Sequence, residues 1–72
     1  MKITVNGVQH DWFEGEITYT EIVYMSDKFP ELTYTITFTK GHAKKPQGIL
    51  FPGNSIRVKG GMSFTVAFTG DA

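Results

Sequence analysis

Ile17-Thr18-Tyr19-Thr20-Glu21-Ile22 is the stretch that decides the fold, because it contains a complete signal for the start of a helix. Thr18 is a residue type that caps helix N-termini, and Glu21 lies three residues later, where its carboxylate can bond back to the cap. Ile17 and Ile22 have the spacing of a hydrophobic staple across that cap. The pattern therefore predicts a helix that begins at Thr18.

The predicted helix is short and has one apolar face. This face is formed by Tyr19, Ile22, Val23 and Ser26. Phe29-Pro30 follows closely, and a proline biases the residue before it toward extended geometry. We therefore expect the helix to end before Phe29 and to lie on a sheet by its apolar face.

Alternating segments before the helix predict a hairpin. Residues 2–5 alternate between polar and apolar side chains, and residues 8–13 return antiparallel with Val8, His10 and Trp12 on one face. Asn6-Gly7 joins them and is the strongest short hairpin signal, because both central residues of a type I′ turn need positive φ. Residues 14–16 are expected to interrupt the second strand.

Alternation is also clear after the helix. Residues 32–39 have period two, with Leu32, Tyr34, Ile36 and Phe38 on one face and four threonines on the other. Residues 48–53 predict a short edge strand that ends in a Pro-Gly turn, and residues 56–58 predict another short extended piece. The final strand covers residues 62–69, with Met62, Phe64, Val66 and Phe68 facing inward.

One helix on one mixed sheet buries every apolar face in this pattern. A right-handed crossover after the second strand is the favoured connection. The sequence thus predicts an α+β fold, a β-grasp (ubiquitin-like) roll with one helix packed on a mixed four- to five-stranded sheet and with the first and last strands parallel at its centre. A small all-β barrel is the main competitor, and the helix signal at Thr18 argues against it. We expect one domain over residues 1–72, with residues 70–72 as a flexible tail.

Composition excludes several classes of protein. A chain of 72 residues buries only about 60–65% of its extended surface, which leaves little room for a core and a deep catalytic pocket. Cysteine is absent, and Lys plus Arg equals Asp plus Glu at seven each, so disulfides, thiolate metal sites and a nucleic-acid partner are not expected. No apolar run approaches the roughly 20 residues that span a bilayer, and no signal peptide is visible. The expected location is the cytoplasm.

Residue types that carry chemistry are isolated along the chain. His10 and His42 have no second ligand at metal-like spacing, and His42 is expected to be solvated in a Lys-rich loop. Ser55 and Ser63 have no paired base. We therefore expect no metal site, no catalytic residue and no enzymatic activity in this chain.

Several of these segments together resemble the bacterial multiubiquitin domain, a ubiquitin-like family. They are Ile3-Thr4-Val5-Asn6-Gly7, residues 14–19, residues 34–38, residues 48–53 and residues 56–64. The resemblance implies a protein modifier whose C-terminal carboxylate is adenylated by an E1-like activating enzyme and passed through an E2-like conjugating enzyme to a target. A JAB-type metallopeptidase is the third implied partner. ATP and magnesium are used by the activating enzyme, so the chain itself has no cofactor, and no membrane partner is expected.

The same resemblance points to two candidate sites. Gly70, Asp71 and Ala72 form the expected activation and conjugation tail; the alternative is a terminus without a role. The tail lacks the two terminal glycines of mature ubiquitin, so trimming by a peptidase before activation is an open alternative. The possible partner-binding face of the sheet consists of Thr33, Thr35, Thr37, Ser63 and Thr65; the alternative is an ordinary solvated face.

Three function classes remain open from the sequence. The first is the covalent modifier, and the second is a non-conjugated ubiquitin-like module that binds partners without tail chemistry. The third is a sulfur carrier, which shares the fold but needs a terminal Gly-Gly that this chain lacks. The modifier is favoured.

Overall fold

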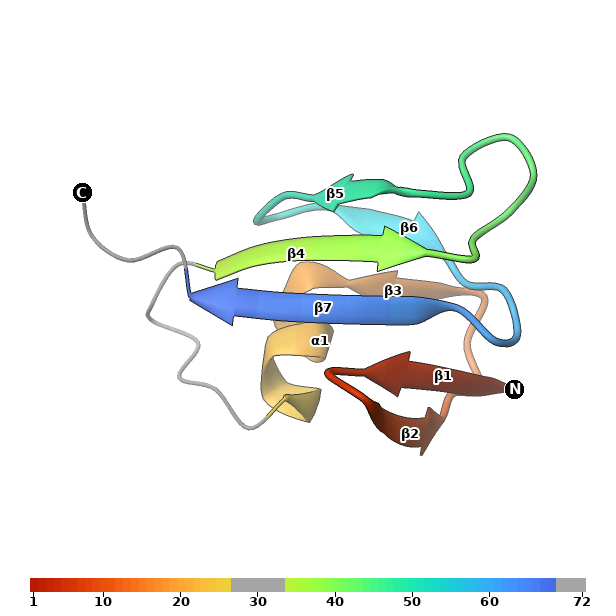
Figure 1. The fold of residues 1–72 in the computed structure, drawn as a ribbon, viewed down its shortest axis with the longest axis horizontal. Coiled ribbons are helices and arrows are strands. Elements are labelled where there is room, and N and C mark those ends of the chain that lie inside the picture. The colour runs from red at the N-terminus through yellow and green to blue at the C-terminus, as the bar shows by residue number, and fades with distance from the viewer. Residues whose placement is uncertain (27–33, 69–72) are drawn as a thin grey trace.

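Seven strands and one helix follow one another in a computed structural model that describes residues 1–26 and 34–68 (Figure 1). The elements are β1 (Lys2–Val5), β2 (Val8–Asp11), β3 (Glu16–Thr18), α1 (Tyr19–Met25), β4 (Tyr34–Thr39), β5 (Gly48–Leu50), β6 (Ser55–Arg57) and β7 (Ser63–Phe68). Five strands form a mixed sheet in the order β2-β1-β7-β4-β5, and β3 pairs with β6 in a second, two-stranded sheet. As predicted, the first and last strands are parallel neighbours at the centre, with Thr4 opposite Ser63 and Val5 opposite Phe64.

The helix begins where the sequence predicts. The Thr18 hydroxyl accepts a hydrogen bond from the Glu21 backbone N–H at 3.1 Å, and the Thr18 N–H donates to the Glu21 carboxylate at 2.9 Å. These two bonds form the predicted capping box. Ile17 and Ile22 on either side of the cap are both fully buried. Local side-chain chemistry therefore fixes the start of α1.

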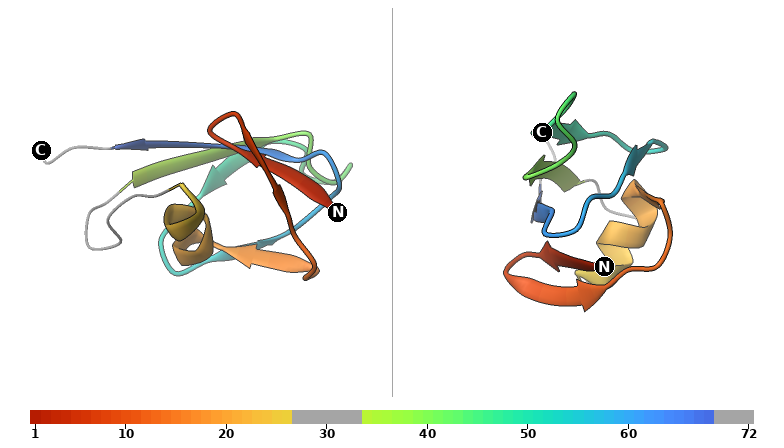
Figure 2. Two further views of the ribbon diagram at one scale, coloured as in Figure 1. Left: turned by 90° about the horizontal axis from the view of Figure 1, so that it is seen from below. Right: turned by 90° about the vertical axis from the view of Figure 1, so that its right-hand side faces the viewer.

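The helix covers one face of the five-stranded sheet, and the hydrophobic core fills the space between them (Figure 2). The buried core residues are Ile3, Val5, Ile17, Tyr19, Ile22, Val23, Tyr34, Ile36, Phe38, Leu50, Val58, Met62, Phe64 and Val66. Phe38 and Phe64 sit on the neighbouring strands β4 and β7, with ring centroids 6.4 Å apart. The inward residues predicted on both strands are thus confirmed where the structure describes them; Leu32 and the side chain of Phe68 lie outside that part.

The sequence reasoning missed strand β3. Residues 14–16 were expected only to interrupt the hairpin, yet Glu16–Thr18 pairs antiparallel with Ser55–Arg57. Backbone bonds continue this pairing at both ends, from Val58 N to Gly15 O at 3.0 Å and from Tyr19 N to Asn54 O at 3.0 Å. A strand of three residues is too short to show period-two alternation, so its partner far along the chain defines it.

The second strand is shorter than predicted. β2 ends at Asp11, and Trp12 then exchanges two bonds with Met1: its N–H donates to the Met1 carbonyl at 2.8 Å, and its carbonyl accepts from the N-terminal amino group at 2.8 Å. The Trp12 indole N–H donates to the Glu16 carbonyl at 3.0 Å. Trp12 therefore closes the hairpin at its open end.

None of the described helices is both long and apolar enough to cross a membrane.

Candidate functional site

The face of the sheet that points away from the helix brings together four of the five residues predicted to bind a partner. Across β4 and β7, Thr35 lies opposite Ala67, Thr37 opposite Thr65 and Thr39 opposite Ser63. Of the predicted residues, Thr35, Thr37 and Thr65 are exposed and Ser63 is half-buried. The predicted residue Thr33 lies outside the described residues.

This outward face is small and polar at its centre and apolar at one border. Ile49 of β5 lies opposite Thr37 and is 46% exposed. On the other side, Thr4 of β1 lies beside Ser63 and is half-buried. The face can therefore supply hydroxyl groups for hydrogen bonds and one aliphatic contact at its rim.

The Asn6 side chain holds strand β7 from the β1 side. Its amide oxygen accepts a hydrogen bond from Val66 N at 2.8 Å, and its amide nitrogen donates to Val66 O at 3.2 Å. The Asn6 backbone N–H donates to Phe64 O at 2.9 Å. Asn6 and Gly7 have φ of 50° and 81°, as the predicted type I′ turn requires. Asn6 thus makes the turn and also extends the pairing of β7, and the second role could not be inferred from the Asn-Gly dipeptide.

Strand β7 is held from the β4 side up to its last residue. Phe68 lies opposite Tyr34, the first residue of β4. The buried Tyr19 hydroxyl fixes Tyr34, because it accepts from Tyr34 N at 2.9 Å and donates to Tyr34 O at 3.4 Å. Figure 1 shows that β7 ends at the end of the sheet remote from the N-terminus. The predicted tail residues Gly70, Asp71 and Ala72 lie outside the described residues and follow this fixed strand.

The prediction that His42 is solvated is wrong. The residue is half-buried, and its Nε2 lies 3.0 Å from the carbonyl oxygen of Val58. Because a carbonyl only accepts, this nitrogen carries the proton and donates. His42 therefore ties the loop after β4 to the residue that follows β6. The sequence gives no sign of this contact, since it depends on how the loop folds back.

The described part of the hairpin carries one ion pair, Lys2 with Asp11, and one half-buried histidine, His10. Lys2 Nζ lies 2.8 Å from Asp11 Oδ1, and the hydrogen bond and charge of Lys2 lower the pKa of the Asp11 carboxyl. His10 is half-buried on β2, and its Nε2 has no hydrogen-bond partner among the described residues. Residues 1–26 and 34–68 contain no group of three or more His, Cys, Asp or Glu side chains placed to hold a metal ion.

A surface hollow next to β5 is the feature that sequence reasoning missed entirely. It has a volume of about 860 Å³ and lies between β5, β6 and the loop that His42 anchors. Its lining combines exposed apolar side chains with three cations, Lys44, Lys45 and Arg57. Residues from three separate segments form it, so no single motif could have revealed it.

The order of the strands and the single helix packed on one face of the sheet are compatible with a ubiquitin-like fold. A family model described as Multiubiquitin matches residues 1–70. The chain therefore belongs to the multiubiquitin family, as the resemblance predicts. Comparison with curated proteins gives no match, and comparison with solved structures gives none either.

Proposed function

We propose that this chain is a protein modifier with a β-grasp fold, activated at its C-terminal carboxylate by an E1-like enzyme and transferred by an E2-like enzyme to a target. The observation that carries the proposal is the family match over residues 1–70, nearly the whole chain. It is supported by the position of β7, which is held on both sides and ends at Phe68, directly before the tail. In this proposal the chain is a substrate, and it acts in a bacterial cytoplasm.

The proposed chemistry uses only the terminal carboxylate of this chain. A carboxylate oxygen attacks the α-phosphorus of ATP and displaces pyrophosphate, which gives an acyl adenylate. A nucleophile of the partner enzyme then attacks the acyl carbon, and AMP leaves with the oxygen that joined the two groups. All other reactive groups, the magnesium ion and the JAB-type peptidase activity belong to partner proteins.

The fixed strand limits the entropy lost when the tail enters an enzyme. Ordering a backbone residue costs roughly 1–2 kcal/mol, so a long mobile segment would bind poorly. Asn6 holds Val66 in place, and the pairing with Tyr34 holds Phe68. The backbone up to Phe68 is therefore already held in place before the tail enters the activating enzyme.

The outward face of the sheet is the proposed docking surface for the activating and conjugating enzymes. Thr37 and Thr65 lie opposite each other at its centre and are both exposed. Their side chains are far from the buried core face, so they can be changed without disturbing packing. Replacement of both by arginine should weaken activation and leave the fold intact.

Activation by the cognate enzyme tests the proposal. With ATP and magnesium, the whole chain should form a covalent adduct with the activating enzyme that mass spectrometry detects. Deletion of residues 70–72 should abolish this adduct, while circular dichroism shows an unchanged fold. An adduct that forms equally well without the tail would contradict the proposal.

Absence of any adduct would favour the second candidate, a ubiquitin-like module that binds partners without being conjugated. The polar, continuous face around Thr37 and Thr65 favours this alternative, since docking on it needs no reactive tail.

A further inference from the structure

Strand β5 has a side that no described strand covers. It forms one edge of the five-stranded sheet and pairs with β4 alone, with Gly48 opposite Phe38 and Leu50 opposite Ile36. Strand β6 lies nearby in Figure 1 but pairs with β3. An edge strand presents unpaired backbone N–H and C=O groups, on which another extended chain can form a further strand.

The hollow of about 860 Å³ lies along this strand. Its lining includes Ile49 and Leu50 of β5, residues 53–57 up to the end of β6, and residues 42–45 of the preceding loop. Its volume is in the range of about 300–1,000 Å³ that is typical of binding clefts. The hollow and the uncovered strand are thus parts of one surface.

The loop that forms one wall of the hollow is fixed by its own bonds. His42 Nε2 donates to Val58 O at 3.0 Å, Gly41 N donates to Pro46 O at 2.8 Å, and Lys45 N donates to His42 O at 2.9 Å. Gly41 is buried, and a Cβ at that position would lie only 2.9 Å from the Lys45 carbonyl oxygen. The wall is therefore formed before any ligand binds.

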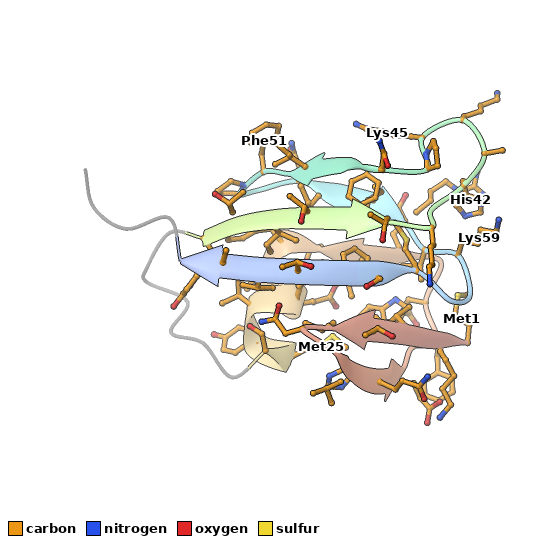
Figure 3. The ribbon with its side chains drawn as sticks, in the orientation of Figure 1. Met1, Met25, His42, Lys45, Phe51 and Lys59 are labelled. Atoms are coloured by element: carbon orange, nitrogen blue, oxygen red, sulfur yellow. The ribbon has the colours of Figure 1, made fainter. Side chains whose placement is uncertain are left out.

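Lys45 and Phe51 lie at the two ends of β5 (Figure 3). A Cβ on Gly48 would lie 3.3 Å from Lys45 Cε, so the side chain of this lysine runs beside the first residue of the strand. Phe51 follows the last residue of β5 and is 58% exposed. A chain laid along β5 would therefore meet a cation near one end and an aromatic ring near the other.

The charge of the hollow is positive, although the chain as a whole is neutral. Lys44, Lys45 and Arg57 line it, against one carboxylate, that of Glu16. Glu16 lies opposite Arg57 in the β3–β6 pairing and accepts a hydrogen bond from the Ser55 hydroxyl at 3.5 Å. Neither lysine of the loop forms an ion pair with a carboxylate in residues 1–26 or 34–68. Complementary charge therefore selects an acidic partner.

We propose that this hollow binds an extended peptide segment of a partner protein, with apolar residues flanked by Asp or Glu. The segment pairs its backbone with β5, its apolar side chains contact Ile49 and Phe51, and its carboxylates meet Lys44, Lys45 and Arg57. The binding is non-covalent and uses the edge of the sheet, which shares Ile49 with the outward face but includes neither Thr37 and Thr65 nor the tail. It therefore holds whether or not the chain is conjugated.

A peptide fits this surface better than a single-stranded nucleic acid does. Nucleic-acid grooves stack successive bases on several aromatic side chains, whereas Phe51 is the one Phe, Tyr or Trp among the described lining residues and the His42 ring is held by its bond to Val58. The free edge of β5 offers backbone pairing that a peptide can use and a nucleic acid cannot.

Titration of the isotope-labelled chain with a blocked peptide tests the proposal by NMR. The peptide alternates valine and threonine and has two aspartates at each end. We expect its binding to shift the amide signals of residues 42–45, 48–51 and 55–57. Lys44→Glu with Lys45→Glu should weaken binding about tenfold, since each exposed ion pair contributes modestly. The matched control, Lys40→Glu with Lys59→Glu, changes the net charge equally at exposed lysines that do not line the hollow and should bind as the unchanged chain does.

Two further comparisons separate strand pairing from charge attraction. Phe51→Ser should weaken binding several-fold, whereas Phe13→Ser, at an 85% exposed aromatic outside the hollow, should not. Two peptides that are N-methylated in opposite alternating phases should differ, because only one phase removes the N–H groups that pair with β5.

Three results would overturn the proposal. They are equal binding of a peptide with lysine in place of aspartate, signal shifts confined to residues other than 42–45, 48–51 and 55–57, and tighter binding of a thymidine oligonucleotide to the same residues. Deletion of residues 70–72 should leave peptide binding unchanged, which keeps this test separate from that of the modifier.

Discussion

Asn6 offers its side-chain amide to Val66, 60 residues further along the chain, and forms both of the hydrogen bonds that a strand residue would form there. Strand β1 ends at Val5, so its own backbone no longer pairs with this part of β7. The hairpin residue therefore extends the centre of the sheet toward the C-terminus. It links the start of the chain to the strand from which the proposed tail emerges.

Asn6→Gly should remove the two hydrogen bonds between the Asn6 side chain and Val66 while it keeps the turn. Glycine accepts the φ of 50° at this position but leaves the N–H and carbonyl of Val66 without their partner. We expect a loss of about 1–3 kcal/mol in the free energy of unfolding and faster hydrogen exchange at Val66. The control Gly7→Ala, at φ 81°, should strain the turn but leave the exchange at Val66 close to that of the unchanged chain. Unchanged exchange in Asn6→Gly would show that the amide does not hold β7.

Thr18→Ala should cost about 1 kcal/mol of stability, because it removes the hydroxyl that accepts the Glu21 N–H. Thr20→Ala changes the same residue type two positions later, on the exposed side of α1, and should be neutral or slightly stabilising. Chemical denaturation of the two variants gives the comparison. Equal stability would mean that the capping box does not determine where α1 begins.

Tyr19→Phe should destabilise the chain by roughly 1–3 kcal/mol, because the buried N–H of Tyr34 loses the hydroxyl that accepts its hydrogen bond. Tyr24, which is 62% exposed on the same helix, provides the matched control Tyr24→Phe, expected to be near neutral. Thermal unfolding measures both variants. The account of Tyr19 fails if the two changes have the same effect.

The Lys2–Asp11 pair should give a small acid-dependent contribution to stability. Lys2 lowers the pKa of the Asp11 carboxyl, chiefly by a hydrogen bond and then by charge. The pair therefore stabilises the fold above the unfolded-state pKa of this aspartate, and the contribution is lost as the pH falls through the lower, folded-state pKa. In Lys2→Gln the pKa of Asp11 should rise toward its ordinary value, as followed by NMR of the carboxyl carbon. High salt should have a similar effect, because both side chains are exposed.

Local patterns explain why the helix start and the two long strands could be predicted. The bonds between Thr18 and Glu21 involve residues only three positions apart, and the alternation in residues 34–39 is complete within one strand. Strand β3 could not be predicted, because it is defined by the pairing of Ile17 with Ile56, a residue distant in sequence. The bond from His42 to Val58 and the hollow beside β5 also arise only when separate segments meet.

In the candidate site, too, local sequence patterns predict some features, whereas others arise only from contacts between distant segments. Alternation is enough to place Thr37 and Thr65 on the outward face, and the pairing of β4 with β7 brings them together. The hydrogen bonds between the Asn6 side chain and Val66 require the parallel pairing of the first and last strands. The Asn-Gly dipeptide gives no information about that pairing. The roles of this face and of residues 70–72 in conjugation stay predictions.

The central claim is that the terminal carboxylate is the group that is activated, and the fate of its oxygen tests this most directly. The chain is prepared with oxygen-18 in both oxygens of its terminal carboxylate, ending at the mature terminus that mass spectrometry identifies. It is then incubated with the cognate activating enzyme, ATP and magnesium until the adduct forms. Each AMP released with the adduct should carry one oxygen-18 atom, because the bridging oxygen leaves with the phosphate. Adduct formation with unlabelled AMP would contradict the account.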